Sequence, residues 1–344
     1  MRTVATMAFV AMAALSFCFP DFIVFRFAQA TIWAIALLGL VVLCGVSGQF
    51  TFAQAALFGM GGYSAALLVN HTALPVYAAL ALAPLVGFAA GYGLGRVASG
   101  HSLWTQALIG YALAVAFPQL LRWQPIERWT GGVQGLSVNS FVSPFAFLSN
   151  DRWSFFIALS LLAAGVWMAA NLVASRTGRA LMAARDHDLA AAAQGVNVVH
   201  LRSAASGAAS AYIALAGCLS ACQFGFVGPT AYNFALSIQM LFGVIVGGMY
   251  SIAGAIIGGI MLEFLPGLVA SWGKGLSALL YAALMIAAIV AMPKGIAGTL
   301  SVLKFLSPVR GRGQVRGLHE LSEPPHPASP PIGGEEKKNE VSCP

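Results

Sequence analysis

Charged residues are scarce in this chain, and their scarcity excludes most soluble folds. Asp, Glu, Lys and Arg make up 8% of its 344 residues, whereas a typical soluble domain carries about 25%. Hydrophobic residues make up 59%. This balance indicates a polytopic membrane protein in contact with membrane lipid. The basic residues are scattered between apolar runs rather than gathered on one face, so the formal net charge of +7 predicts no nucleic-acid partner.

Metal-binding and catalytic signatures are also lacking. None of the five cysteines stands at the spacing of a metal site. The nearest approach to a phosphate-binding loop is GLVASWGK (Gly267–Lys274). It has one residue too many between its glycines, and Gly275 replaces the Ser or Thr. The sequence therefore predicts no enzyme, no metal, no cofactor bound by this chain and no ATPase site of its own.

Ten apolar segments are long enough, at about 17–25 residues, to cross a bilayer. The sequence thus predicts an all-α, polytopic integral membrane protein of about ten transmembrane helices. The first segment imitates a signal peptide, but no small-x-small cleavage site follows it, so we interpret it as a retained span. The segments are 4–20, 29–47, 52–70, 76–96, 103–121, 153–174, 203–223, 233–248, 252–269 and 276–292.

Basic residues are divided unevenly between the predicted loops. With the N-terminus inside, the outer side holds only Arg26, Arg122, Arg128, Arg152 and Lys274. The inner side holds Arg2, Arg96, Lys294, Lys304 and the four arginines of one long loop. Cytoplasmic loops carry the excess of Lys and Arg, so this orientation is the predicted one. Residues 1–305 form the predicted membrane domain, and 306–344, rich in Pro, Gly and charge, a disordered cytoplasmic tail.

That long loop, Arg176–Arg202, holds Arg176, Arg179, Arg185 and Arg202. Four arginines in hydrocarbon would cost roughly 12 kcal/mol on insertion scales, so the loop is predicted to lie in water. Its middle, ALMAARDHDLAAAAQ, consists of strong helix formers, and Gly195 follows as a C-cap. One helix from about Arg179 to Gly195, held between two spans, predicts a docking surface for another protein.

Polar residues interrupt the apolar run GVSGQFTFAQAALFGMGGYSAALL (Gly45–Leu68). Transporters often form substrate sites from broken helices, where freed backbone groups line a cavity. A polar hairpin at the cytoplasmic interface is the alternative interpretation. The residues predicted to line a pathway are Ser47, Gln49, Thr51, Gln54 and Tyr63.

Small residues and one acid also lie within the predicted spans. Gly87, Gly91 and Gly95 share one helix face and predict close helix packing, and the stretch Gly247–Gly259 predicts a tight cytoplasmic turn. Glu263 is the one acid inside a predicted span, and we interpret it as snorkelling or locally paired. Three Arg-Trp pairs, at 122–123, 128–129 and 152–153, predict interfacial anchors.

Four segments of this chain resemble the permease subunits of branched-chain amino-acid ABC importers, of the LivM-like type. Together they cover most of residues 30–270, and the resemblance is more specific for the family than for the substrate. The segments are GQFTFAQAALFGMGGYSAALL, TGGVQGL (Thr130–Leu136), GRALMAARDHDLAAAAQGVNV (Gly178–Val198) and SIQMLFGVIVGGMYSIAGAIIGG (Ser237–Gly259).

The resemblance implies a subunit of a binding-protein-dependent importer in the bacterial inner membrane. It implies a second related permease subunit, two cytoplasmic ATP-binding subunits that hold the ATP, and a periplasmic substrate-binding protein. The loop helix is then similar to a coupling helix that docks on the ATPase. The residues expected at that contact are Arg179, Arg185, Asp186, Asp188, Ala190, Ala191 and Gly195.

The expected mechanism is ATP-driven alternating access, with branched-chain amino acids as cargo. The same architecture importing urea, short amides or aromatic acids is the nearest alternative. An ion-coupled secondary transporter would need paired intramembrane acids or a helical repeat, and the sequence contains one such acid and no clear repeat.

Overall fold

The structure is a computed structural model that describes residues 19–72, 75–145 and 149–270, with side chains described as far as Gly267. The predicted spans 4–20 and 276–292 and the predicted tail 306–344 lie outside these residues. The helices and strands in chain order are α2 (Asp21–Leu40), a π-helical turn η1 (Val41–Val46), α3 (Gln54–His71), α4 (Val76–Ala98), α5 (Leu103–Leu121), α6 (Gln124–Thr130), the short 3-10 helix η2 (Gly132–Gln134), β1 (Leu136–Ser137), α7 (Asn150–Ala174), α8 (Arg176–Asp186), α9 (Asp188–Ala193), α10 (Val198–Phe224), β2 (Phe226–Val227), the 3-10 helix η3 (Pro229–Tyr232), α11 (Phe234–Gly247) and α12 (Ile252–Ala270).

Five helical stretches in the described part of the chain are long and apolar enough to cross a membrane: α2 with η1, α4, α5, α7 and α10. The predicted helical membrane protein is therefore confirmed, whereas the count of ten spans is not. The expected span 233–248 corresponds to α11, which has 14 residues. At 1.5 Å per residue it is about 21 Å long, less than the hydrocarbon core of about 30 Å.

α10 lies at the centre of the bundle and is packed closely by α3, α4 and α2. The glycines of α4 make this possible. A Cβ at Gly91 would overlap the Ser210 side chain and lie 2.7 Å from the carbonyl oxygen of Ser206. Gly87 and Gly95 meet the same helix one turn away on either side. The packing role predicted for these three glycines is confirmed, because each faces a neighbouring helix within this subunit.

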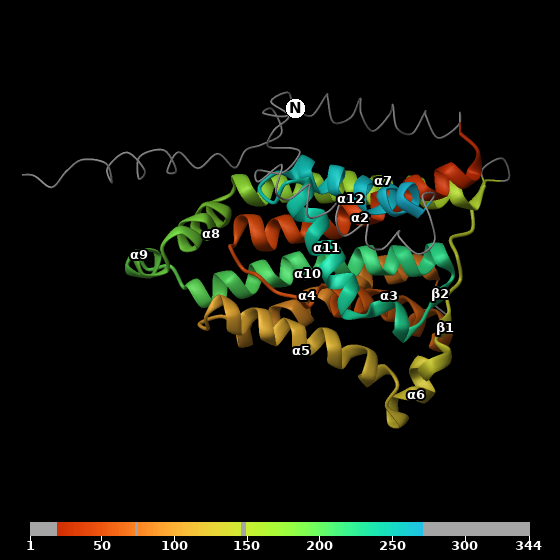
Figure 1. Cartoon of the computed structure of the whole chain (residues 1–344), viewed down its shortest axis with the longest axis horizontal. Coiled ribbons are helices and arrows are strands. Elements are labelled where there is room, and N and C mark those ends of the chain that lie inside the picture. The colour runs from red at the N-terminus through yellow and green to blue at the C-terminus, as the bar shows by residue number, and fades with distance from the viewer. Residues whose placement is uncertain (1–18, 73–74, 146–148, 271–344) are drawn as a thin grey trace, which may run out of the picture. The chain divides into compact units, whose positions relative to one another are not determined.

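α2 and α12 lie side by side and are joined by an ion pair (Figure 1). The Nε atom of Arg26 lies 3.3 Å from a carboxylate oxygen of Glu263, and a second nitrogen donates to the Glu263 carbonyl at 3.0 Å. Glu263 is therefore paired, as one of the two interpretations expected, but its partner is an arginine of another helix. The placement of Arg26 in an outer loop was wrong, because α2 begins at Asp21 rather than at residue 29. Pairing with Glu263 lowers the cost of placing this arginine within a membrane helix.

The bundle has two distinct ends (Figure 1). At one end lie α8, α9, the linker 47–53 and the turns 99–102 and 248–251, and we call this the α8–α9 end. The predicted tight turn in Gly247–Gly259 is confirmed as the connection from α11 to α12. At the opposite end, β1 and β2 form a two-stranded antiparallel ladder with Leu136 opposite Val227. Two adjacent glycines before β1, Gly131 and Gly132, have positive φ and turn the chain into it.

Candidate functional site

The segment between α7 and α10 forms two helices rather than the single helix predicted. α8 ends at Asp186, His187 is extended with φ −149° and ψ 100°, and α9 begins at Asp188. Helix propensity is a weak influence that tertiary contacts override, and here Asp188 is bonded to a side chain of α10. Gly195 has φ +82°, so its predicted left-handed conformation just beyond α9 is confirmed.

One face of α8 packs onto the bundle. Leu181 is 2% exposed and lies in a small apolar cluster with Val46 at the end of η1, Val173 in the last turn of α7 and Ala205 of α10. Ser175 caps the helix by accepting a hydrogen bond from the Gly178 amide at 3.0 Å. α8 is therefore fixed to three membrane-domain helices along a single face.

The residues expected to contact an ATPase fall into two groups. Arg179, Asp186, Ala190 and Gly195 are exposed at the surface of the α8–α9 segment. Arg185, Asp188 and Ala191 face other parts of the protein or are bonded to them. Beside the exposed group, Leu189 on α9 is 87% exposed. Single exposed apolar side chains are common on protein surfaces, so Leu189 by itself does not define a contact.

Arg185 is turned toward the membrane domain. Its Nη1 donates to the carbonyl of Gly45, in the last turn of η1, at 2.6 Å. Its guanidinium carbon lies 4.5 Å from the centre of the Tyr250 ring, in the α11–α12 turn. The stem of Arg185 covers Gly48, where a Cβ would lie 2.5 Å from the arginine Cγ. One side chain thus joins α8 to two breaks in the membrane helices.

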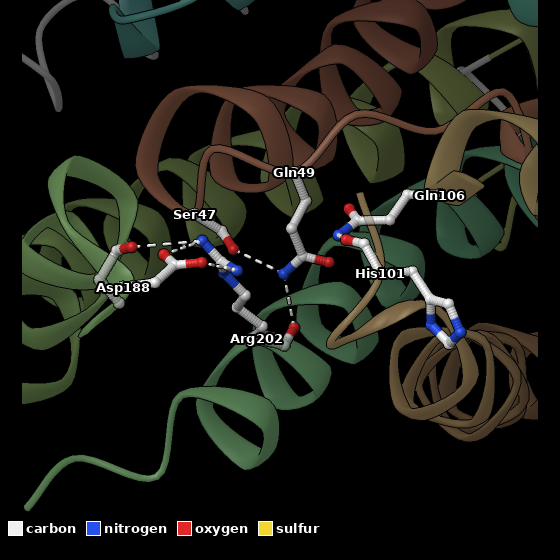
Figure 2. A network of polar contacts seen from close by, with 7 residues as sticks. Ser47, Gln49, His101, Gln106, Asp188 and Arg202 are labelled. Atoms are coloured by element: carbon white, nitrogen blue, oxygen red, sulfur yellow. Dashed lines mark hydrogen bonds and ion pairs between the residues drawn. The ribbon is translucent and has the colours of Figure 1, made fainter. Parts of the chain in front are cut away.

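Arg202 and Asp188 form a bidentate ion pair that joins α10 to α9. Two nitrogens of Arg202 donate to the two oxygens of Asp188, at 2.8 and 2.5 Å, and one of them also donates to the Ala184 carbonyl. Arg202 was expected in the loop, and that was wrong: α10 begins at Val198 and contains it. Figure 2 shows Arg202 between Asp188 and the amide of Gln49.

The linker 47–53 separates η1 from α3, as the polar break in the sequence predicted. It is non-helical and packs against α5, where a Cβ at Gly110 would lie 2.7 Å from the amide nitrogen of Phe52 and 3.0 Å from that of Ala53. Gly110 stands seven residues into α5, about 10 Å from its start. Irregular backbone at such depth is tolerated where protein covers it or where it lines a cavity.

The five predicted pathway residues are all buried, but they do not form one cluster. Gln49 lies at the α8–α9 end, where its Nε2 donates to the Ser47 hydroxyl at 2.6 Å and the Arg202 carbonyl at 2.8 Å. Further along the linker, the amide of Gln54 donates to the Thr51 carbonyl at 2.5 Å. The structure thus brings Ser47 and Gln49 together with the α8–α9 segment, while Thr51 and Gln54 lie beyond them.

Tyr63 lies apart from the other four, nine residues or about 13 Å along α3 from Gln54. Its ring is part of an aromatic cluster with Phe117 and Tyr232, whose centroids lie 6.3 and 5.9 Å away. Its buried hydroxyl has no hydrogen-bond partner among the described residues. Tyr63 therefore belongs to the apolar interior of the bundle rather than to the polar end.

A cavity of about 630 Å³ opens at the α8–α9 end. Its walls come from the linker, the start of α5, the α8–α9 junction and α10. Several of its residues were not among the candidate site residues of the sequence, among them His101, Ser102 and Gln106. A signal was present for one of them, because Gln106 is a lone amide within the apolar segment 103–121. The aromatic partner Tyr250 was also missed, since nothing local links it to Arg185.

The fold and this polar end define a class: a multi-pass helical membrane protein of the transporter type, with an irregular buried linker between two helices. The family model described as the branched-chain amino acid transport system / permease component matches residues 22–289. The chain belongs to this family, and it is an ABC-type transport permease subunit.

Relatives with curated names agree with this assignment. The high-affinity branched-chain amino acid transport system permease protein LivM of Salmonella typhimurium is 27% identical over 294 residues, covering 77% of this chain and 67% of the relative. LivM of Escherichia coli K12 has the same identity and coverage. The LivH protein of the same Salmonella strain is 24% identical over 296 residues, covering 79% of this chain and 93% of the relative. No solved structure matches the chain.

Proposed function

We propose that this chain translocates branched-chain amino acids as one permease subunit of a binding-protein-dependent ABC importer. It works by ATP-driven alternating access beside a second, related permease subunit. Two cytoplasmic ATP-binding subunits supply the work, and a periplasmic protein delivers the cargo. The α8–α9 end faces the cytoplasm of a bacterium, and the membrane is the inner membrane.

The observation that carries this proposal is the two-sided construction of the α8–α9 segment. Its outer surface exposes Arg179 and Gly195, and its inner surface is bonded to η1, α10 and the α11–α12 turn. ATP-driven work enters a permease only through a contact that differs between two states. A segment held firmly on its inner side and open on its outer side suits that role.

Cargo chemistry follows from the polar residues near the linker. Ser47, Gln49, Thr51 and Gln54 supply dipoles but no charge along 47–54. A zwitterionic amino acid with an apolar side chain needs dipoles and apolar walls rather than one fixed ion pair. The names of the curated relatives point to the same cargo. Urea, short amides and aromatic acids are the alternative cargoes.

The test is reconstitution of this chain with its partner permease, ATP-binding subunits and binding protein in proteoliposomes. Uptake of radiolabelled leucine should require both ATP hydrolysis and the binding protein, and unlabelled isoleucine and valine should compete better than urea or phenylalanine. Leucine uptake driven by a proton or sodium gradient without the ATP-binding subunits would instead identify a secondary transporter. ATP-dependent uptake of urea alone would keep the class and overturn the cargo.

A further inference from the structure

The cavity at the α8–α9 end has polar, charged and apolar walls. Gln49 and Gln106 contribute amides, and Leu103 and Leu189 contribute apolar side chains. The charged and imidazole side chains of the wall are Arg185, Arg202, Asp186, Asp188, His101 and His187. Its volume, about 630 Å³, falls within the range of about 300–1,000 Å³ that small-molecule sites occupy. The walls belong to four segments far apart in the sequence, so the cavity is a product of the tertiary fold.

Two amide oxygens at this cavity can still accept hydrogen bonds. The nitrogen of Gln49 is bonded to Ser47 and Arg202, and that of Gln106 donates to the His101 carbonyl at 3.1 Å. Neither Oε1 atom accepts a hydrogen bond from any described residue. Both side chains are buried, at 6% and 5% exposure. Figure 2 shows the oxygen of Gln49 on the side where Gln106 and His101 lie.

The guanidinium of Arg185 can still donate hydrogen bonds. One of its nitrogens donates to the Gly45 carbonyl, and within the described chain its other N–H groups have no acceptor. A guanidinium carries five donors and binds carboxylates in a planar fork. Arg202 differs, because its fork is occupied by Asp188. The cavity therefore offers as acceptors the two amide oxygens and the Asp186 carboxylate, which has no side-chain partner among the described residues. Its donors are the partly free guanidinium of Arg185 and the Nε of Arg202, which has no partner in the described chain.

These groups match the parts of an apolar α-amino acid. Amide oxygens accept from an ammonium group, a guanidinium donates to a carboxylate, and apolar walls cover an aliphatic side chain. We infer that this cavity is a second binding site for the cargo amino acid, on the side where the cargo leaves the transporter. This inference rests on the proposed function, and it adds a place where released cargo remains in contact with the protein.

The position of the cavity allows a bound amino acid to influence the transport cycle. Leu189 and Ala190 of α9 form part of its wall, so an amino acid bound there touches the α8–α9 segment directly. A ligand shifts a conformational equilibrium by its difference in affinity for the two states. Cargo in the cavity therefore favours the arrangement in which α9, α5 and the linker enclose the same cavity, and a high inner concentration slows the cycle.

The experiment measures equilibrium binding of radiolabelled leucine to the purified full complex in nanodiscs, without the binding protein and without ATP. Gln106→Leu should weaken binding about tenfold or more, because it removes an acceptor for a charged group. Leu103→Trp should also weaken it by filling the cavity without altering the amide contacts. Gln119→Leu is the matched control, since Gln119 is an exposed glutamine on the same helix, and it should bind leucine like the wild type.

The outcomes separate this inference from the proposed function. Unchanged leucine binding in both Gln106→Leu and Leu103→Trp would overturn the cavity site, whatever the uptake assay shows. Loss of the ATP-binding subunits from these two variants would also overturn it, by showing that a partner fills the cavity. Uptake by the wild-type complex tests the proposed function by itself. The expected result is weaker leucine binding in both variants, with the subunits retained and the control unchanged.

Discussion

Arg185 and Gly45 are joined by a hydrogen bond of 2.6 Å across 140 residues of sequence. Gly45 lies in η1, a π-helical turn, and such turns leave carbonyl groups with altered partners. The arginine that satisfies this carbonyl also lies over Tyr250. A movement of α8 must therefore move η1 and the α11–α12 turn, or break these contacts.

The first prediction concerns this linkage. Arg185→Ala should lower leucine uptake per ATP hydrolysed at least about fivefold, the size of a modest coupling free energy, while the ATP-binding subunits remain attached. Arg185→Lys should give an intermediate loss, because an ammonium cannot both donate to Gly45 and lie flat over Tyr250. Uptake, hydrolysis and subunit retention are measured on the same proteoliposomes. Arg96→Ala, an exposed arginine at the same end, is the control, and an equal loss there would contradict the specific linkage.

The second prediction uses two glycines of α4. Gly91→Ala should destabilise the protein by about 1–3 kcal/mol, the usual cost of overpacking, because its Cβ would overlap Ser210. Gly93→Ala should be neutral or stabilising, since no atom lies within 4 Å of a Cβ there. Thermal unfolding in detergent, followed by size-exclusion profiles, compares the two variants. Equal melting temperatures would contradict the close approach of α4 and α10.

These glycines also show how far the sequence predicts the fold. The spacing of Gly87, Gly91 and Gly95 places them on one helix face, and periodicity alone identifies that face as a packing surface. The polar break after Gly45 and the left-handed Gly195 are similarly local, and both were predicted. What periodicity could not identify was the partner, α10, whose small residues stand more than a hundred positions away.

Features that depend on contacts between residues far apart in the sequence were not predicted, because periodicity does not identify such partners. The helix formers of 180–194 predict one helix, but the ion pair of Asp188 with Arg202 accompanies a break at His187. Arg26 was placed outside the spans, and its pairing with Glu263, 237 residues away, has no local signal in the sequence. In the candidate site, Ser47 and Gln49 could be selected as buried polar residues. Gln106 and the cavity could not be selected, since they exist only after the helices have assembled.

The third prediction concerns the pair between α2 and α12. The side chains of Arg26 and Glu263 are 27% and 19% exposed, so both charges are partly removed from water. Arg26→Met leaves the carboxylate unpaired and should cost about 1–3 kcal/mol of stability. Adding Glu263→Gln removes that charge and should restore part of the loss. Thermal unfolding of the two single variants and the double variant gives the interaction free energy. Strictly additive losses would show that the pair contributes no coupling.

The fourth prediction is the orientation in the membrane. Exposed arginines at the α8–α9 end include Arg96, Arg176 and Arg179, and cytoplasmic loops carry the excess of Lys and Arg. In a Cys18→Ser/Cys343→Ser background, an impermeant thiol reagent applied to intact cells should label Asn139→Cys but not Ser175→Cys. The three cysteines of the described residues, Cys44, Cys218 and Cys222, are buried and should stay unlabelled. Labelling at Ser175→Cys with protection at Asn139→Cys would reverse the assignment.

The last prediction concerns Gly195, just beyond α9. A Cβ there meets no atom within 4 Å, so a side chain clashes with nothing inside this subunit. Its φ of +82° still penalises most residues, by about 1–2 kcal/mol, whereas Asn tolerates this conformation. Gly195→Val should therefore leave membrane insertion intact and weaken either the hold on the ATP-binding subunits or the link between hydrolysis and uptake.

Gly195→Asn separates the two causes of that effect. The asparagine keeps the left-handed backbone and adds bulk. Loss of coupled uptake in Gly195→Val alone would indicate strain in the α9–α10 connection. Loss of coupled uptake in both variants would indicate a partner packed closely on this surface. Asp186→Ala removes an exposed charge from the same surface, while Asp188→Ala also breaks the pair with Arg202. Reconstituted uptake, ATP hydrolysis and subunit retention are scored for each variant. Normal coupled transport in Gly195→Val and in the Asp186→Ala/Asp188→Ala double variant would refute the proposal that the α8–α9 segment couples ATP hydrolysis to transport.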